Sequence, residues 1–288
     1  MNFKNGKELL ALCKENNMSI AEVMIKRESE ATNENSTDIK KRMGVALDIM
    51  KNAAKSSIQN PVKSIGGLIG GEAKKVSESE YKICGDILSD AISYSLSVLE
   101  VNATMGLIVA APTAGSSGVI PGVITALGEH KNLSEEVMIN GLMTSGAIGY
   151  IFMRNATVAG AEGGCQAEVG AASAMASAMI VEMLGGSAEQ ALNASAFAIS
   201  NILGMVCDPI AGLVESPCQN RNAIGVANAF TSAQLAMAKI SHPVPFDEMV
   251  DVMYDVGKTL PASLRETAKG GCACTPTGCS LSCKIFNN

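Results

Sequence analysis

The fold class is indicated first by "QAEVGAASAMASAMIVEML", residues 166–184. This stretch carries few charges and is built largely from Ala, Ser, Gly and Met, so we expect a buried helix whose small side chains let its neighbours approach closely. Gly185 and Gly186 end it. Ser187 with Gln190 then forms a capping box that starts the next helix.

The segments on either side also have helical periodicity. Apolar residues recur at helical spacing in 39–58 and 219–240, and Ser19 with Glu22 makes another capping box. We find no internal repeat and no period-two alternation typical of strands. The sequence therefore predicts an all-α fold, a compact multi-helix domain with small-residue helix packing.

We expect one helical catalytic domain over 1–288, ending in a cysteine-rich C-terminal tail at 271–288. The glycine-rich stretch 67–76 is predicted to be a loop. An α/β fold is the alternative, and "GLIVAAP" at 106–112 is its only serious strand candidate.

Composition excludes several classes of protein. A net charge of -6 and a pI near 5.1 argue against a nucleic-acid or anionic-membrane surface, which needs clustered Lys and Arg. The apolar stretch in residues 1–17 is too short and too interrupted by charges for a signal peptide. The most apolar region, 101–128, lacks the unbroken run of about 20 residues that spans a bilayer. We expect a cytoplasmic protein with protein and small-molecule partners.

Nine cysteines in such a chain indicate metal ligands, reactive thiols or small buried side chains rather than disulfides. Cys13 and Cys84 lie in predicted helices, where a buried hydrophobic role is expected. Cys165, Cys207 and Cys218 all lie at predicted helix–loop junctions. Helix N-termini stabilise thiolates, which suits Cys165 and Cys218, but position alone leaves chance placement open.

The sequence around these three cysteines resembles a known family. "GGCQAEVGAASAMASA", "CDPIAGLVESPCQNRN" and "VAAPTAGSSGVIPGV" together resemble the α subunit of the oxygen-sensitive iron–sulfur L-serine dehydratases. The likeness runs through nearly the whole chain, and the cysteine spacings of 42 and 11 residues match that family's cluster ligands.

The resemblance implies conversion of L-serine to pyruvate and ammonia. It implies a [4Fe-4S] cluster held by Cys165, Cys207 and Cys218, with one iron left open as a Lewis acid for the serine hydroxyl. Three thiolates suit a catalytic cluster, because an electron-transfer cluster usually takes four.

A second candidate site is "APTAGSSGVIPGV", residues 111–123. Its glycines and hydroxyls precede a predicted helix, where backbone N–H groups and a serine hydroxyl can hold the substrate carboxylate. We predict substrate contacts from Thr113, Gly115, Ser116 and Ser117. A tight turn without a ligand is the alternative.

The general base stays unassigned. Glu162, Glu168 and Arg221 flank the cysteines and are candidates to bind the ammonium group, orient a ligand or cap helices. His130 and His242 look like surface residues at a helix end and in a loop. The resemblance implies a separate β subunit with a Ser-rich His-Thr motif, so we expect a heterodimer or heterotetramer.

The tail is a departure from the family pattern. In single-chain relatives, a C-terminal cysteine can cap the open iron in the resting enzyme. A second metal site and exposed, unliganded thiols are the alternatives here. The tail cysteines are Cys272, Cys274, Cys279 and Cys283.

Three rival functions stay open on the sequence. A pyridoxal-phosphate lyase needs a Schiff-base lysine, and no lysine occurs between Lys131 and Lys239. An iron–sulfur L-cysteine desulfidase would use the same open iron with a thiol leaving group, and it is the runner-up. A non-catalytic protein holding zinc or an electron-transfer cluster is the third.

Overall fold

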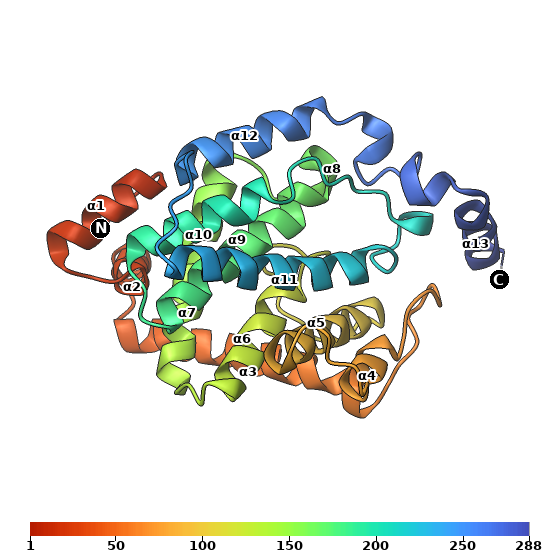
Figure 1. Ribbon diagram of the computed structural model, residues 1–288, viewed down its shortest axis with the longest axis horizontal. Coiled ribbons are helices and arrows are strands. Elements are labelled where there is room, and N and C mark those ends of the chain that lie inside the picture. Colours follow the sequence, from red (N-terminus) through yellow and green to blue (C-terminus); the bar gives the residue numbers. More distant parts are fainter. Residues whose placement is uncertain (288) are drawn as a thin grey trace.

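The computed structural model describes residues 1–287, and the predicted all-α class is confirmed within them (Figure 1). The described residues contain no strand, only an isolated parallel bridge between Cys207 and Arg265. The helices are α1 (Gly6–Asn16), α2 (Ile20–Thr32), α3 (Ser36–Gln59), α4 (Glu72–Ser77), α5 (Asp86–Ala103), α6 (Val119–His130), α7 (Glu135–Asn155), α8 (Gly160–Gly163), α9 (Cys165–Met183), α10 (Ala188–Ser200), α11 (Cys218–Met237), α12 (Phe246–Thr259) and α13 (Pro276–Phe286), with 3₁₀ turns η1 (Ile210–Gly212), η2 (Ala262–Leu264) and η3 (Gly271–Cys274).

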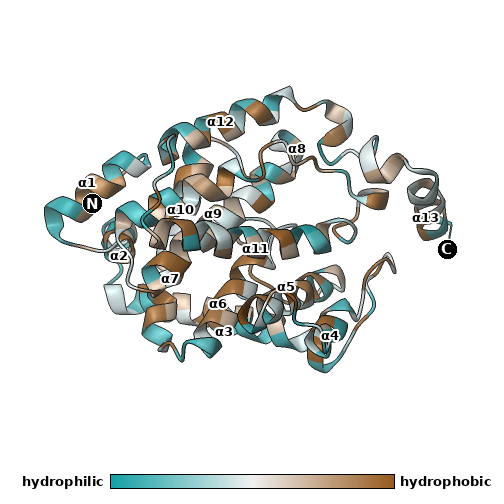
Figure 2. Cartoon of the chain, viewed as in Figure 1, coloured by the Kyte–Doolittle hydropathy of each residue, from teal (hydrophilic) through white to brown (hydrophobic). Residues whose placement is uncertain are grey.

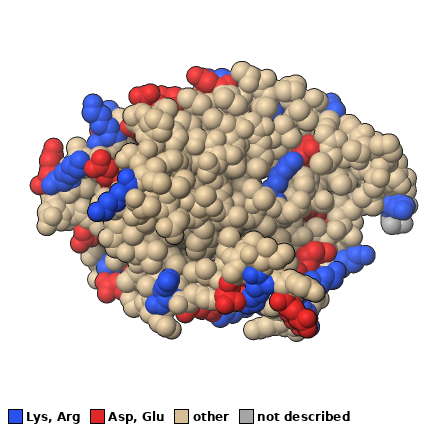
Figure 3. All heavy atoms as spheres, in the orientation of Figure 1, with Lys and Arg blue, Asp and Glu red and all other residues tan. Residues whose placement is uncertain are grey.

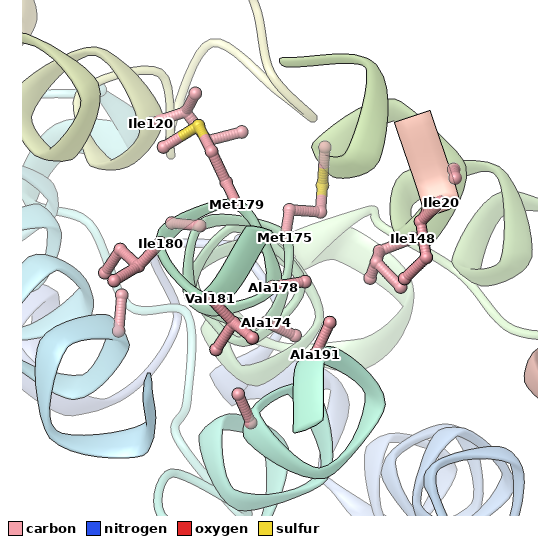
Figure 4. Close-up of a cluster of buried hydrophobic side chains, with 14 of the residues drawn as sticks. Ile20, Ile120, Ile148, Ala174, Met175, Ala178, Met179, Ile180, Val181 and Ala191 are labelled. Carbon is pink, nitrogen blue, oxygen red and sulfur yellow. The ribbon is translucent and has the colours of Figure 1, made fainter. Parts of the chain in front are cut away.

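Helix α9 is the centre of the bundle. Every residue in it except Glu182 is buried, and α6, α7, α10 and α11 all pack on it. Figure 4 shows side chains from four other helices around the Ala, Met, Ile and Val residues of α9. At Gly225 of α11 a Cβ would come within 2.8 Å of Val169 on α9, so the two backbones are close because no side chain separates them.

The predicted helix signals are confirmed. Both capping boxes form, at Ser19 with Glu22 and at Ser187 with Gln190. The predicted ranges 39–58, 166–184 and 219–240 correspond to α3, α9 and α11, with ends that differ by at most three residues.

Two local predictions need correction. The stretch 67–76 is only partly a loop, because α4 starts at Glu72. Cys84 is exposed in a turn before α5 and is not buried in a helix. The strand candidate of the α/β alternative, 106–112, forms no strand in the described residues: 106–110 lie outside helices and turns, and 111–112 form a bend.

Charged residues lie mainly at the periphery of the bundle (Figure 3). Figure 2 shows hydrophilic segments on outer parts such as the end of α1, and Figure 3 shows Lys, Arg, Asp and Glu scattered around the rim of one face whose centre is almost uncharged. No helix in the described part of the chain is both long and apolar enough to cross a membrane.

Candidate metal centre and active site

The structure brings Cys165, Glu168 and Cys207 together in the interior. One ligand atom from each, the two Sγ atoms and a carboxylate oxygen, lies within 4.8 Å of the others, and all three residues are buried. Gly160 borders the group: a Cβ there would lie 2.7 Å from a Glu168 oxygen and 3.1 Å from the Cys207 Sγ. A side chain at position 160 would therefore clash with the group, and glycine allows this close approach.

Local backbone structure fixes each of the two sulfur positions. Cys165 is the first residue of α9, directly after Gly164, whose φ of 74° turns the chain into the helix. Cys207 follows α10 in a loop, and its backbone N–H donates to the Leu264 carbonyl at 2.8 Å. The Cys207 carbonyl accepts from the Glu266 N–H at 2.7 Å, so both backbone groups of Cys207 bind the segment after α12.

The surroundings shift the pKa values of the two thiols in opposite directions. A hydrogen bond from Cys207 and the nearby positive charge of Arg221 lower the pKa of the Cys165 thiol despite its burial. The same hydrogen bond and burial raise the pKa of Cys207, so this thiol keeps its proton in the metal-free chain. Together they form a buried sulfur pair beside a positive charge, which suits a metal that binds soft ligands.

Arg221 supplies that positive charge and is itself held in place. Its guanidinium donates to the Cys165 Sγ at 3.4 Å and to the Asp208 Oδ1 at 2.6 Å. Although burial opposes it, the charge on Cys165 and the hydrogen bond to Asp208 raise the pKa of Arg221, which keeps it charged. Of the roles left open from sequence, the geometry supports orientation of the Cys165 sulfur.

Cys218 lies close by but outside the group of three. It is the first residue of α11 and is only 6% exposed. Burial and the charge on Cys165 raise the pKa of Cys218 to about 12. All three predicted ligand cysteines are therefore buried, and two of them share a tight group with Glu168.

Glu168 links the sulfurs to the predicted substrate loop. The Thr113 hydroxyl donates to Glu168 Oε1 at 2.8 Å and lies 3.0 Å from the Ser116 hydroxyl. A Cβ on Gly115 would lie 3.1 Å from the same carboxylate oxygen. Burial raises the pKa of Glu168 to about 7. The two stretches that the sequence presented as separate candidate sites are one site in space.

A buried asparagine that the sequence analysis did not single out joins this loop to α11. The Asn222 Nδ2 donates to the Gly115 carbonyl at 2.7 Å and to the Cys218 carbonyl at 2.9 Å, and its Oδ1 accepts from the Gly118 N–H at 3.0 Å. Its position four residues after Cys218, one helical turn on, is the only sequence signal for it. Ser117 is buried, and its hydroxyl donates to the Ala114 carbonyl within the loop.

Three further candidates lie apart from this site. Glu162 is exposed, and its carbonyl accepts from Arg265. His130 ends α6, with its Nε2 2.8 Å from an Asp90 oxygen, and His242 lies in the loop after α11, with its Nδ1 2.7 Å from the Val244 carbonyl. The expected helix-end and loop positions of the histidines are confirmed.

The tail approaches the site through its backbone. The Cys272 N–H donates to Asp208 Oδ2 at 2.6 Å, on the carboxylate that also holds Arg221. All four tail cysteines are exposed, and within residues 1–287 their sulfurs form no group of three or more ligands. Cys279 and Cys283 lie on α13, and Cys274 ends η3.

The comparisons with known proteins agree with this geometry. Residues 15–273 match the family model described as "Serine dehydratase alpha chain". The chain is 47% identical to the probable L-serine dehydratase, alpha chain, of Bacillus subtilis (strain 168), over 99% of this chain and 95% of that protein. It is 46% identical to the L-serine dehydratase, alpha chain, of Peptoniphilus asaccharolyticus, over 96% of each.

A longer relative is L-serine dehydratase 1 of Escherichia coli (strain K12). It is 34% identical over 94% of this chain, but the match covers only 61% of that protein. The match to the family model and the two near-full-length relatives settle the assignment: this chain belongs to the serine dehydratase alpha chain family.

Proposed function

We propose that this chain is the α subunit of an L-serine dehydratase that holds a [4Fe-4S] cluster and converts L-serine to pyruvate and ammonia together with a separate β subunit, as a heterodimer or heterotetramer. The observation that supports the proposal most is the position of Glu168, which lies beside the buried Cys165 and Cys207 sulfurs and accepts a hydrogen bond from Thr113 of the substrate loop. The alpha-chain relatives support both the reaction and the need for a second chain.

We assign Cys165, Cys207 and Cys218 as the cluster ligands. Their burial, the charge of Arg221 and the positions of Cys165 and Cys218 at helix N-termini suit a thiolate-bound iron–sulfur group. Such a cluster supplies a Lewis-acidic iron that draws electrons from the substrate hydroxyl.

The loop from Thr113 to Ser117 is suited to bind the substrate carboxylate. In the part of the chain that the structure describes, the N–H groups of Thr113, Ala114 and Gly115 donate to no protein acceptor, so they are available to an anion. Thr113 and Ser116 add hydroxyl donors at the same place. Glu168, beside them, is placed to accept from the ammonium group.

The reaction balances without an external oxidant. Loss of the α proton and the β-hydroxyl releases water and leaves 2-aminoacrylate. Its imine tautomer then takes up one water and gives pyruvate and ammonia. The chain's task is to hold the carboxylate and ammonium so that the hydroxyl points at the sulfurs.

A pair of cysteine variants tests the proposal. With the β-type chain co-expressed anaerobically, Cys207→Ser should lose bound iron and sulfide and at least about a hundredfold of serine deamination, because a hydroxyl is a poor ligand for iron of this kind. Cys13→Ser is the control, because Cys13 is equally buried but lies outside the site.

Three results would contradict the proposal. Equal effects of Cys207→Ser and Cys13→Ser would remove the ligand assignment. Zinc without sulfide in the native protein would remove the cluster. Faster turnover of L-cysteine than of L-serine would favour the desulfidase alternative, although the named relatives are serine dehydratases.

A further inference from the structure

An exposed apolar surface lies directly beside the candidate site. Met105 and Leu107, in the segment after α5, are 83% and 73% exposed, and Ile65 in the loop before α4 is 74% exposed. The Ile65 N–H donates to the Ala103 carbonyl at 3.1 Å, which places this loop beside the start of the segment. Large apolar side chains grouped in this way are typical of surfaces that another protein covers.

The backbone of the same segment is free to pair. Residues 106–110 are extended, and within residues 1–287 the N–H and carbonyl groups of 107–110 make no hydrogen bond to other protein groups. The side chains of Ile108 and Val109 pack inward on the hydrophobic core, which holds the segment in place. A fixed, unpaired, extended segment is a template for a strand from a second polypeptide.

Both parts of this surface are joined to the site. The segment continues into the loop of Thr113 and Gly115. The loop before α4 is tied to the stretch between Cys207 and Cys218 by Glu215, whose carboxylate accepts from the Ser64 hydroxyl at 2.6 Å and from the Gly66 N–H at 2.7 Å. A polypeptide bound here would therefore adjoin both the substrate loop and the cysteine loop.

The relatives indicate what covers this surface. This chain corresponds to 95–96% of the two alpha chains but to only 61% of the longer protein of Escherichia coli. The part of that longer protein outside the match is our candidate for what covers this surface, and in the two-chain enzyme it corresponds to the β subunit. This step rests on the two-chain function proposed above.

We propose that the β-type chain, homologous to that remaining part, docks on Ile65, Met105 and Leu107 and pairs an extended strand with residues 107–110. Residues 101–128 contain no charged side chain, and neither do residues 64–71. The contact is therefore apolar, and its affinity should change little between low and high salt, because screening acts on charges.

The test is the affinity of the two purified, metal-free chains, measured by calorimetry. Leu107→Asp should weaken binding at least about tenfold, the order expected when the burial of one leucine is lost. Ile83→Asp is the matched control: Ile83 is 92% exposed but lies before the other end of α5, roughly 27 Å away at 1.5 Å per residue. Ile83→Asp should leave the affinity within about twofold of the unchanged chain.

Proline substitutions test the strand pairing. Neighbouring N–H groups of an extended segment point in opposite directions, so only one of Val109 and Ala110 can donate to the added strand. Proline at that position should weaken binding more than proline at the other. Neither change removes a backbone hydrogen bond within this chain. Circular dichroism of each variant checks that the helices are retained.

The outcomes separate the docking proposal from the proposed function. The docking surface alone would be overturned if Leu107→Asp and Ile83→Asp weakened binding equally, or if neither weakened it, while the two unchanged chains together still deaminated serine. Normal binding by both proline variants would overturn the strand pairing. Absence of any complex would overturn the partner, and self-association of this chain that Leu107→Asp abolishes would assign the surface to a second copy instead.

Discussion

The hydrogen bonds of Asn222 lead to a prediction that separates stability from activity. The side chain is fully buried and makes three hydrogen bonds, to Gly115, Gly118 and Cys218. Each contributes about 1 kcal/mol net, so Asn222→Ala should lower the free energy of unfolding by about 3 kcal/mol. It should also release the substrate loop from the cysteine-bearing end of α11.

Asn228 on the same helix is a matched control. It is 8% exposed and also makes three hydrogen bonds, to Ala198, Asn201 and Ser232, but none to the site. Asn228→Ala should therefore lose a similar free energy of unfolding, measured by urea denaturation. Under conditions where both variants are folded, kcat/KM for serine should fall at least about tenfold for Asn222→Ala only, because small displacements of binding groups are costly.

Equal losses of kcat/KM in the two variants would refute the role given to Asn222. Such a result would mean that general destabilisation, rather than the link between loop and helix, lowers activity. A stable Asn222→Ala protein with unchanged kcat/KM would refute it as well.

Two other predictions concern packing and pH. Gly122→Ala should lower the free energy of unfolding by about 1–3 kcal/mol, because its Cβ would lie 2.6 Å from the Ala91 carbonyl oxygen. Gly146→Ala on α7 is the control: its Cβ would meet nothing within 4 Å, so the change should raise the free energy of unfolding by up to about 1 kcal/mol. Equal urea midpoints for the two variants would contradict this prediction. Burial raises the pKa of Cys13 from 9.0 to about 11, so the folded state holds this proton more tightly than the unfolded state does. The contribution of the Cys13 thiol to the free energy of unfolding is fully present below about pH 9 and is lost as the pH rises to about 11. The loss is at most about 3 kcal/mol. Cys13→Ala should show a smaller fall of unfolding free energy over that range, and an identical pH profile would contradict the assignment.

Features that depend on neighbours in sequence were predictable. Helix α9 and the box of Ser187 with Gln190 follow from local composition and capping. Cys84 was misplaced because it directly precedes the helical pattern of α5, yet the chain turns there, with Gly85 at a φ of 74° just before the helix. Short helices such as α4 are equally hard to find, because a glycine pair before them indicates a break without showing where it ends.

The site was predictable in its residue types and not in its connections. The cysteines and the hydroxyl loop stand out in the sequence, but the contact of Thr113 with Glu168 spans 55 residues and that of Asn222 with Gly115 spans 107. No local pattern reports such pairings, because they arise from the packing of whole helices. The adjacency of the two candidate sites therefore had to come from the structure.

The origin of the three sulfurs in separate parts of the bundle determines when the protein can mature. Cys165 begins α9, Cys207 follows α10 and Cys218 begins α11, so no short piece of the newly made polypeptide contains the full set. The helices must therefore assemble before a metal can bind all three sulfurs. On the ligand assignment proposed above, cofactor loading is a late event in biogenesis, and a pool of folded but inactive protein should accumulate in cells starved of iron.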